Sequence, residues 1–555
     1  MANQETPRPI SRLWLLLRDH KNDIFNIYAY AVLGGLMQLV VPLGIQSIIS
    51  FVMGATISTS IYILIAMVIV AVLLVGIFQI NTMKIIEKIQ QKIFVGNAFA
   101  FAENIPRMDL KSTDRIYLPE FVNRFFDTLN VQKGLSKILI EVPIASIQIL
   151  FGLGLLSFYN PIFIGFGIIL VFMLYLILQF TSRRGIQTSL KESSYKYSVV
   201  AWLQEMARII KSFKFSQGTH LNLRKTDQDV LGYLDARTNH FKVLLLQYKI
   251  LVVFKILITG FMLIAGTMLL LEQKLNVGAF IAAEIVILTI LGAVEKLISS
   301  LDSVYDVVTG LEKVASVKET PLEKQGTQSF ELHQDGIAVR LHNLSFGYED
   351  KTTVLNNVNL DIKPGQKICF TGKDASGKTT LLKLLSGSYS DYSGMLHVNH
   401  QPLHSYNLQT LRQNTGTYLQ HQDIFKGTVF ENITLGKEAI SANQVIELAK
   451  HLGIQDFLNN IPMGLDELLD PTGKRLSTKI IESILVLRAL VHKPQLLLLE
   501  EPWLSFSDEV KAKMINYLLH QTPDTTVLIV TTESAFMSAC DVHFELSNGT
   551  IVKVK

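Results

Sequence analysis

The residues with the clearest chemical potential lie in KICFTGKDASGKTTLLKLL, where an apolar strand leads into a glycine-containing turn and then a helix. In such a P-loop, glycines let the backbone wrap around phosphates, and the amides and the helix N-terminus supply a positive field. Lys378 can reach the β and γ phosphates, and the Thr379 hydroxyl can hold Mg²⁺. A chance match in a glycine-rich turn is the alternative, but the strand-to-helix context argues against it. The predicted phosphate-binding residues are Gly372, Lys373, Asp374, Ala375, Ser376, Gly377, Lys378, Thr379 and Thr380.

A second apolar strand, QLLLLEEPW, ends in two consecutive acids, Glu500 and Glu501. P-loop enzymes keep a metal-ordering acid and a water-activating acid at this edge of the sheet. Glu500 is therefore the candidate Mg²⁺ ligand, and Glu501 is the candidate base. Surface carboxylates also cap strands often, so the prediction gains its weight from the P-loop.

Composition limits the class of protein in which these residues work. The chain has 555 residues, 49% of them hydrophobic and 18% charged, and its mean hydropathy is +0.32. These values exclude a disordered protein and a small disulfide-stabilised one. The two cysteines, Cys369 and Cys540, are too far apart in sequence to predict a metal cluster or a disulfide framework. The net charge of +4 gives no reason to expect nucleic acid as a partner.

Six apolar stretches occupy the first half of the chain, each near the roughly 20 residues that a helix needs to cross a bilayer. Buried helices of a large soluble protein are the alternative, but six in succession, three of them joined by very short connections, argue against it. We therefore predict that the first half is embedded in a membrane. The predicted spans are residues 24–49, 59–83, 136–158, 160–181, 246–271 and 277–299.

Basic residues predict the orientation in the membrane. The outward connections, residues 53–58, 159–160 and 272–276, together hold one basic residue, Lys274. By the positive-inside rule, the N-terminus, both long loops and the P-loop domain are cytoplasmic in a multi-pass protein of the inner or plasma membrane. Residues 10–20 are predicted to form an interfacial helix on the lipid surface. The basic residues of the inner side are Arg8, Arg12, Arg18, Lys21, Lys84, Lys88, Lys92, Arg107, Lys111, Arg115, Arg183 and Arg184.

Changes of pattern along the chain predict the domain boundaries. Loops 83–135 and 181–245 carry apolar residues at helical spacing, so residues 1–319 are predicted to be a transmembrane domain with long helical cytoplasmic loops. The run TPLEKQGTQSFELHQDG, residues 320–336, is polar and aperiodic, which predicts a linker. Residues 337–555 alternate short β-rich runs with helical ones, which is typical of an α/β domain with a largely parallel sheet.

The order of six spans, linker and P-loop domain resembles an ATP-binding cassette (ABC) exporter half-transporter over essentially the whole chain. The resemblance implies an α-helical transmembrane domain of the type I exporter fold, fused to an α/β P-loop nucleotide-binding domain that uses ATP and Mg²⁺. It implies that Tyr348, in FGY, stacks on adenine. It also implies that Gln420, in YLQHQDIFKGTVFENI, contacts Mg²⁺ and senses the membrane domain. The opening HKNDIFNIYAYAVLGGLMQLVVPLGIQSII is similar to type I secretion and peptide exporters.

The family's signature, Leu-Ser-Gly-Gly-Gln, aligns with Leu476, Ser477, Thr478, Lys479 and Ile480, so that its first two positions match. In dimers of this family each signature caps the γ phosphate held by the opposite P-loop, which makes Ser477 a candidate nucleotide contact. The family's glycines allow close backbone approach, and we expect the side chains of Thr478 and Lys479 to obstruct it. Lys479 could instead offer its charge to the phosphate.

Three other positions depart from the family. Glu500 replaces the metal-ordering aspartate and is one methylene longer, which we expect to displace an octahedral Mg²⁺ shell. Thr532, in TVLIVTTES, aligns with the switch histidine, and Ser507 aligns with the aspartate of the D-loop. We expect nucleotide binding to be retained, and hydrolysis to be slow or dependent on a partner.

Three ionisable residues, Glu141, Lys255 and Glu284, lie within or near the predicted spans. Such groups are costly in hydrocarbon, so by default they face a partner or the transport pathway. At a rise of 1.5 Å per residue, Lys255 and Glu284 are expected within roughly 6 Å of each other in depth, which predicts an ion pair. The pair could be structural or could contact substrate.

The sequence and the resemblance together predict a dimeric, ATP-driven exporter of a peptide, a protein or an amphipathic molecule. The partners would be a second half-transporter, identical or different, membrane lipid and, from the type I secretion likeness, a periplasmic adaptor protein. The alternative is a regulatory or scaffolding half that binds ATP but hardly hydrolyses it. Neither a signal peptide nor the leader-trimming peptidase domain of some family members is expected, because about twenty residues, with one short apolar run, precede the first span.

Overall fold

The computed structural model describes residues 9–53, 59–114, 116–215, 220–332, 335–348, 353–419, 422–470 and 476–555. The chain folds into two compact units. The helical unit consists of Met1–Arg107 and Arg115–Thr320, and the α/β unit consists of Met108–Asp114 and Pro321–Lys555. The short segment Met108–Asp114 lies between the second and third spans in sequence, yet it packs with the P-loop half of the chain.

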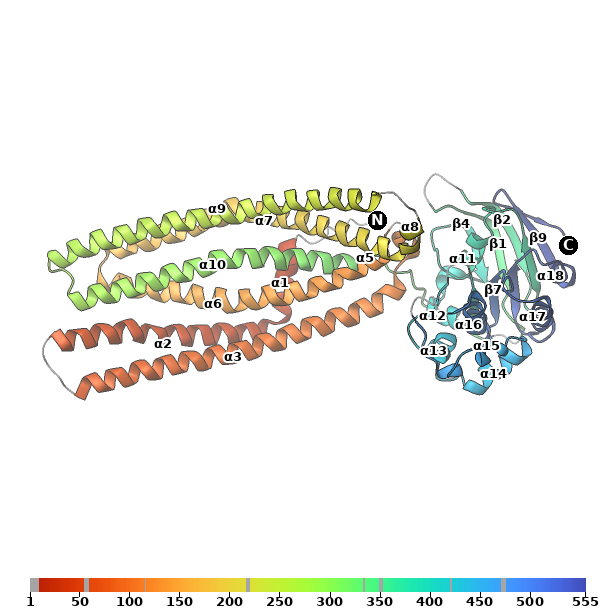
Figure 1. The fold of residues 1–555 in the computed structure, drawn as a ribbon, viewed down its shortest axis with the longest axis horizontal. Helices are drawn as coiled ribbons and strands as arrows, with labels where there is room; N and C mark the ends of the chain where they lie inside the picture. Colours follow the sequence, from red (N-terminus) through yellow and green to blue (C-terminus); the bar gives the residue numbers. More distant parts are fainter. Residues whose placement is uncertain are drawn as a thin grey trace. The chain divides into compact units, whose positions relative to one another are not determined.

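Among the described residues, six helices of the helical unit are long and apolar enough to cross a membrane, which confirms the prediction of six spans. They form long rods that continue beyond the predicted spans (Figure 1). They are α2 (Lys21–Met53), α3 (Thr59–Asn104), α6 (Asp127–Tyr159), α7 (Ile162–Arg208), α9 (Leu221–Leu271) and α10 (Val277–Lys318). Shorter helices are α1 (Pro9–Asp19), α5 (Leu118–Asn123) and α8 (Ile210–Phe215).

Glycines let α6 and α10 pack closely against each other. A Cβ atom on Gly134 would lie 2.5 Å from Val307 Cγ2, and one on Gly310 would lie 2.8 Å from Val131 Cγ2. Small residues at such positions allow the two helix backbones to approach closely where α6 and α10 continue beyond the predicted spans. A larger side chain at either glycine would push the two helices apart.

The predicted Lys255–Glu284 ion pair is wrong, because Lys255 Nζ instead contacts Glu295 Oε2. Helices α9 and α10 are joined by the short turn 272–276, so residues meet when they lie equally far from that turn. At 1.5 Å per residue, Lys255 lies roughly 24 Å from its end of the turn and Glu295 roughly 27 Å, whereas Glu284 lies roughly 10 Å away. Counting depth from the turn, rather than across the whole span, gives the observed partner.

The predicted interfacial helix is present as α1. Its Arg12 side chain is buried and pairs with two acids near the end of α10, Glu312 and Glu319, the second at 2.6 Å. Trp14 on the same helix is 68% exposed. A helix with a buried arginine on one side and an exposed indole on another suits the boundary between protein and lipid headgroups. Arg12 therefore fastens this helix to the C-terminal end of α10.

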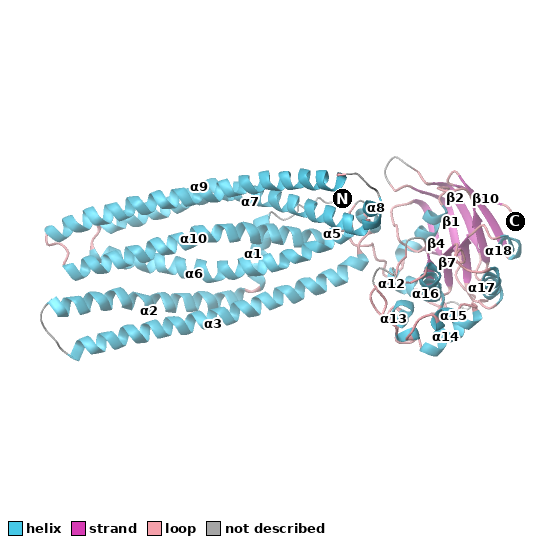
Figure 2. Cartoon of the chain, in the orientation of Figure 1, coloured by secondary structure: helices cyan, strands magenta, loops and turns pink. Residues whose placement is uncertain are grey.

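The α/β unit contains two sheets (Figure 2). The larger has the strand order β10-β9-β3-β8-β7-β6. Its strands β9, β3, β8, β7 and β6 run parallel to one another, and β10 is antiparallel to β9. The smaller sheet is antiparallel, with the order β2-β1-β4-β5. Parallel pairing brings the carboxyl ends of β3, β7 and β8 to one edge, where ligands of such sheets bind. The strands are β1 (Val339–Phe346), β2 (Leu355–Ile362), β3 (Lys367–Thr371), β4 (Ser393–Val398), β5 (Gln401–Pro402), β6 (Thr415–Tyr418), β7 (Leu496–Glu500), β8 (Thr526–Val530), β9 (Val542–Ser547) and β10 (Thr550–Lys553).

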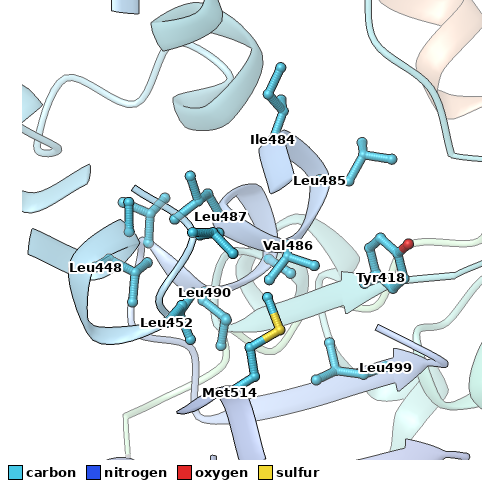
Figure 3. Close-up of a cluster of buried hydrophobic side chains, with 14 of the residues drawn as sticks. Tyr418, Leu448, Leu452, Ile484, Leu485, Val486, Leu487, Leu490, Leu499 and Met514 are labelled. Carbon is cyan, nitrogen blue, oxygen red and sulfur yellow. The ribbon is translucent and has the colours of Figure 1, made fainter. Parts of the chain in front are cut away.

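Helix α16 (Thr478–Leu490), which follows the altered signature, is anchored in an apolar core. Figure 3 shows its side chains, including Leu487 and Leu490, packed among Tyr418, Leu499 and Met514 from neighbouring elements. Burial of this face fixes the direction in which the N-terminus of α16 points. The other helices of the unit are α4 (Leu110–Thr113), α11 (Lys378–Leu385), α12 (Leu408–Gln413), α13 (Val429–Thr434), α14 (Ala442–His451), α15 (Asp456–Asn459), α17 (Asp508–His520) and α18 (Ser534–Ala539).

Part of the predicted linker packs onto the α/β unit. Arg412 donates two hydrogen bonds to the Glu323 carboxylate, at 2.7 and 2.8 Å. Gln328 pairs with Tyr406 in an isolated β-bridge. A bidentate arginine–carboxylate pair holds both position and orientation. The polar composition of this run indicated the absence of regular structure, but it gave no sign of these contacts.

Candidate nucleotide site

The P-loop connects the end of β3 to the start of α11. Its backbone has positive φ angles at Gly372 (144°), Ala375 (60°) and Gly377 (100°). A Cβ atom on Gly372 would lie 2.2 Å from the Leu546 carbonyl oxygen, and one on Gly377 would lie 2.7 Å from Leu355 Cδ2. Both glycines are therefore required by space as well as by backbone conformation. A side chain at either position would collide with neighbouring residues of the domain and disturb the shape of the loop.

Lys378 is folded over the loop that precedes it. Its Nζ donates to the carbonyl oxygens of Gly372 (2.8 Å) and Lys373 (2.7 Å), and it lies 3.4 Å from Ser376 Oγ. A phosphate oxygen could take the place of these neutral acceptors, because a charge-assisted hydrogen bond is roughly twice as strong as a neutral one. Of the predicted loop residues, Lys373, Asp374 and Ala375 are exposed, and Ser376 is buried.

The candidate Mg²⁺ ligands lie together at the ends of two adjacent elements. Thr379 is the second residue of α11, and its hydroxyl donates to Glu500 Oε1 at the end of β7. Glu500 is 5% exposed. Two oxygen ligands in direct contact fit a hard cation such as Mg²⁺, which also takes oxygens from bound phosphates. The longer side chain of Glu500 thus reaches the P-loop threonine. Gln420, the third predicted metal ligand, lies outside the described residues.

Tyr348 lies beside the P-loop helix, where its hydroxyl is 2.9 Å from Thr380 Oγ1. Its ring meets Tyr389 edge to face, with centroids 5.4 Å apart. The Tyr389 hydroxyl donates to the Asp114 carboxylate at 3.3 Å. Burial, followed by the nearby charge of Asp114, raises the pKa of Tyr389, so the hydroxyl keeps its proton at neutral pH. Two aromatic side chains therefore separate the candidate adenine site from the segment Met108–Asp114.

The candidate base, Glu501, follows β7 with a positive φ of 45°. Its carboxylate does not point into open solvent, because Thr531 Oγ1 donates to one oxygen at 2.9 Å and the Thr532 amide donates to the other at 2.9 Å. Thr532, the residue at the predicted switch position, thus contacts the acid through its backbone.

The signature region begins α16. Ser477 caps this helix, accepting from the Ile480 amide at 3.4 Å, and Thr478 is its first residue. Ser507 is the N-cap of α17 without a side-chain hydrogen bond to that helix. The described hydrogen bonds of Ser477 thus cap α16, and a nucleotide contact by this residue stays a prediction.

The α/β unit also contains a cavity of 380 Å³. Its lining includes Gln422, Lys437, Arg488 and His492. Desolvation, with a smaller contribution from Lys437, lowers the pKa of His492 to about 4. The imidazole is therefore neutral at physiological pH.

Sequence inspection did not find Thr531, Trp503 and Tyr389. Trp503 Nε1 donates to Thr531 Oγ1 at 3.1 Å, which places it behind the Glu501 contact. In the register of β7 and β8, Glu500 pairs with Val530, which sets Glu501 beside Thr531. A correct prediction of that register would have indicated the contact between Thr531 and Glu501.

Membrane-spanning helices and a P-loop α/β domain on one chain define a membrane-bound nucleotide-binding protein. Residues 355–504 match the family described as ABC transporter. The fold matches a structure described as "Structure of a bacterial Atm1-family ABC exporter with ATP bound" with a TM-score of 0.81, at 16% identity, over 96% of this chain and 94% of that one. The chain thus carries an ABC transporter nucleotide-binding domain, and it has the fold of an ABC exporter half-transporter with that domain on the cytoplasmic side.

Two curated relatives bear this out. The chain is 25% identical to the Alpha-hemolysin translocation ATP-binding protein HlyB of Escherichia coli O157:H7, over 63% of this chain and 50% of that protein. It is 27% identical to the ATP-dependent lipid A-core flippase of Syntrophus aciditrophicus, over 50% of this chain and 46% of that protein. The chain spans about half the length of the curated relatives it matches.

Proposed function

We propose that this chain is one half of a dimeric ABC exporter, in which ATP binding and hydrolysis move a substrate outward across the membrane. The observation that carries the proposal is the contact between Thr379 and Glu500 next to the P-loop, in a chain whose described residues include six helices long and apolar enough to span a membrane. A phosphate-binding loop with adjacent oxygen ligands suits ATP with Mg²⁺, which would neutralise phosphate charge between Thr379 and Glu500.

In this mechanism each side chain has a separate task. The loop amides and Lys378 bind the phosphates, Tyr348 stacks on the base, and Glu501 accepts a proton from the attacking water. The Ser477 region of a second chain closes over the γ phosphate. Closure of two such sites draws the paired α/β units together, and the spans respond by opening outward.

The segment Met108–Asp114 supports the transmission step. Lys111 Nζ contacts Asp391 Oδ2 at 3.1 Å, the Asp109 amide donates to the Pro321 carbonyl at 2.9 Å, and Asp114 accepts from Tyr389. This part of a loop between two spans thus packs with the nucleotide-binding domain. A shift of that domain would pull on both spans through covalent bonds.

The substrate remains a broad class in this proposal: a peptide, a protein or an amphipathic molecule. The two relatives above are named for hemolysin translocation and for lipid A-core flipping, which supports export and favours neither substrate. By the same likeness, a periplasmic adaptor protein is a proposed partner.

A second candidate function is a regulatory half that binds ATP and turns it over slowly. It is favoured by Thr478 and Lys479 at the start of α16, where side chains would crowd a phosphate. In a homodimer both sites would carry every altered residue, whereas a more complete partner would divide them between two sites. We favour the heterodimer if the transporter turns over briskly in the cell.

The test is an ATPase assay with native mass spectrometry on the chain purified from its own membrane, with Glu501→Gln as control. Export predicts MgATP hydrolysis that Glu501→Gln abolishes, by this chain or by its mixed dimer. A stable homodimer with substrate-stimulated hydrolysis would contradict the heterodimer. MgATP binding without hydrolysis in any isolated assembly would contradict the exporter and support the regulatory half.

A further inference from the structure

The carboxylate of Glu501 is held by two consecutive threonines at the end of β8. Thr531 Oγ1 donates to Oε2 at 2.9 Å, the Thr532 amide donates to Oε1 at 2.9 Å, and Thr532 Oγ1 donates more weakly to Oε1 at 3.4 Å. The Glu501 amide also donates to the Val530 carbonyl at 2.9 Å. Both the backbone and the side chain of Glu501 are therefore tied to the neighbouring strand.

The direction of the Thr531 hydroxyl follows from its partners. Trp503 Nε1 and the Glu533 amide both donate to Thr531 Oγ1, each at 3.1 Å. A hydroxyl has two lone pairs and a single hydrogen, and an indole N–H can only donate. The two N–H groups fill both lone pairs, so the hydrogen of Thr531 is left for Glu501. Trp503 is 1% exposed, so water cannot readily replace it in this role.

The same count leaves Glu501 one place for water. An ionised carboxylate offers about four acceptor positions on two oxygens. The two donors on Oε1 and the single donor on Oε2 occupy three of them. Among the described residues, these donors hold the carboxylate in one orientation and leave an acceptor position on Oε2.

We propose that Thr531 is a positioning residue for Glu501, and that Trp503 orients the Thr531 hydroxyl for this task. The inference rests on the proposed function, in which Glu501 serves ATP hydrolysis. In that step the water oxygen bonds to the γ phosphorus and the bond to the ADP oxygen breaks with its electron pair. The water's proton passes to Glu501 Oε2. The relay Trp503–Thr531–Glu501 orients the base in a site that has threonine at position 532.

The first test replaces the Thr531 hydroxyl without changing the size of the side chain. In the full chain, Thr531→Val should lower kcat about tenfold with little change in KM or MgATP affinity, and Thr531→Ser should restore it. The loss should fall on kcat because the hydroxyl orients the base and touches no nucleotide. Native kcat in Thr531→Val would overturn the inference, as would a parallel loss of MgATP affinity.

A second test needs no turnover. The chain has three tryptophans, Trp14, Trp202 and Trp503, so Trp503 alone emits after Trp14→Phe and Trp202→Phe. In this background, Glu501→Gln should shift the Trp503 emission, because the group that Thr531 donates to has changed. The matched control is Glu509→Gln, since Glu509 is exposed and pairs with Lys513.

The two tests separate this inference from the proposed function. An emission shift with Glu501→Gln in a chain that hydrolyses no ATP would contradict the exporter and leave the relay standing. The opposite result is also possible: Glu501→Gln abolishes hydrolysis but does not shift the Trp503 emission, and Thr531→Val leaves hydrolysis unchanged. That result would support the exporter and overturn the relay.

Discussion

The loop that would wrap the phosphates and the strand ends that carry the acids meet at one edge of the same sheet, yet they tolerate change differently. In the loop, Gly372 and Gly377 have no room for a Cβ atom. At the strand ends, the longer Glu500 still reaches Thr379, and Thr532 still contacts Glu501 through its amide. We therefore expect phosphate binding to depend on backbone shape, which a side chain at either glycine would disturb, and turnover to depend on side chains from several elements.

The difference teaches that affinity and rate should be separable in this protein. Groups that act on the ground state change binding, and groups that act only in the transition state change kcat. Substitutions on the turnover side or on the binding side should each leave the other side as it is, and a substitution at His492 should change neither.

The largest effect is expected from restoring the turnover side. A combined Thr478→Gly, Lys479→Gly, Glu500→Asp and Thr532→His variant should raise the ATPase rate by about 10²-fold, because preorganised contacts to the transferring phosphate typically have this weight. MgATP affinity should change much less. The measurement is steady-state hydrolysis beside nucleotide binding. A native chain that already hydrolyses as fast as the variant would remove the proposed separation.

The next effect concerns the binding side. Lys378→Ala should weaken MgATP binding by about 10- to 100-fold, since a charge-assisted hydrogen bond to phosphate is lost. Equilibrium binding of a fluorescent ATP analogue to the membrane-embedded chain would measure it. Lys373→Ala is the matched control, because this exposed lysine belongs to the same loop and contributes its backbone carbonyl. Equal losses in the two variants would show that Lys378 has no special part.

A smaller effect is expected where Tyr348 would stack on adenine. Tyr348→Ala should reduce ATP affinity about tenfold through loss of stacking, whereas Tyr348→Phe should bind nearly as well. The hydroxyl contact to Thr380 is lost in both variants, so the pair isolates the ring from the hydroxyl. Should Tyr348→Phe bind as poorly as Tyr348→Ala, the hydroxyl contact rather than stacking would support the site.

The smallest effect is one of stability and should touch neither side of the site. The pKa of His492 is about 4 in the folded chain, against about 6.5 when unperturbed. Between these two pH values, the unfolded chain therefore binds more protons than the folded chain. The stabilisation that depends on a neutral His492 is present above pH 6.5 and is lost as the pH falls through 4. His492→Gln should flatten the fall of the unfolding temperature between pH 6.5 and 4, by the equivalent of about 3 kcal/mol at most. Unchanged pH dependence would place the titration elsewhere.

Those parts of the molecule that depend on neighbours in sequence could be predicted. The P-loop is one continuous run, and the spans are continuous apolar stretches, so composition and spacing identified both. The Lys255–Glu295 pair depends on the position of a turn, and counting across the whole span named the wrong acid. The contacts of Glu501 depend on the register between β7 and β8 and on a tryptophan whose partner is 28 residues away in sequence. Such hydrogen bonds are set by tertiary pairing, which no local pattern carries.

The length of the helices has a mechanical consequence. Helices α7, α9 and α10 contain no proline, whereas α2 and α6 contain Pro42 and Pro143. Since sharp kinks arise mainly at proline, α7, α9 and α10 are expected to stay nearly straight, whereas α2 and α6 are expected to bend at their prolines. At 1.5 Å per residue α7 is roughly 70 Å long, so a tilt of about 5° would carry one end about 6 Å relative to the other. A stiff helix of this length therefore turns a small change of angle into a displacement of several ångströms between its two ends.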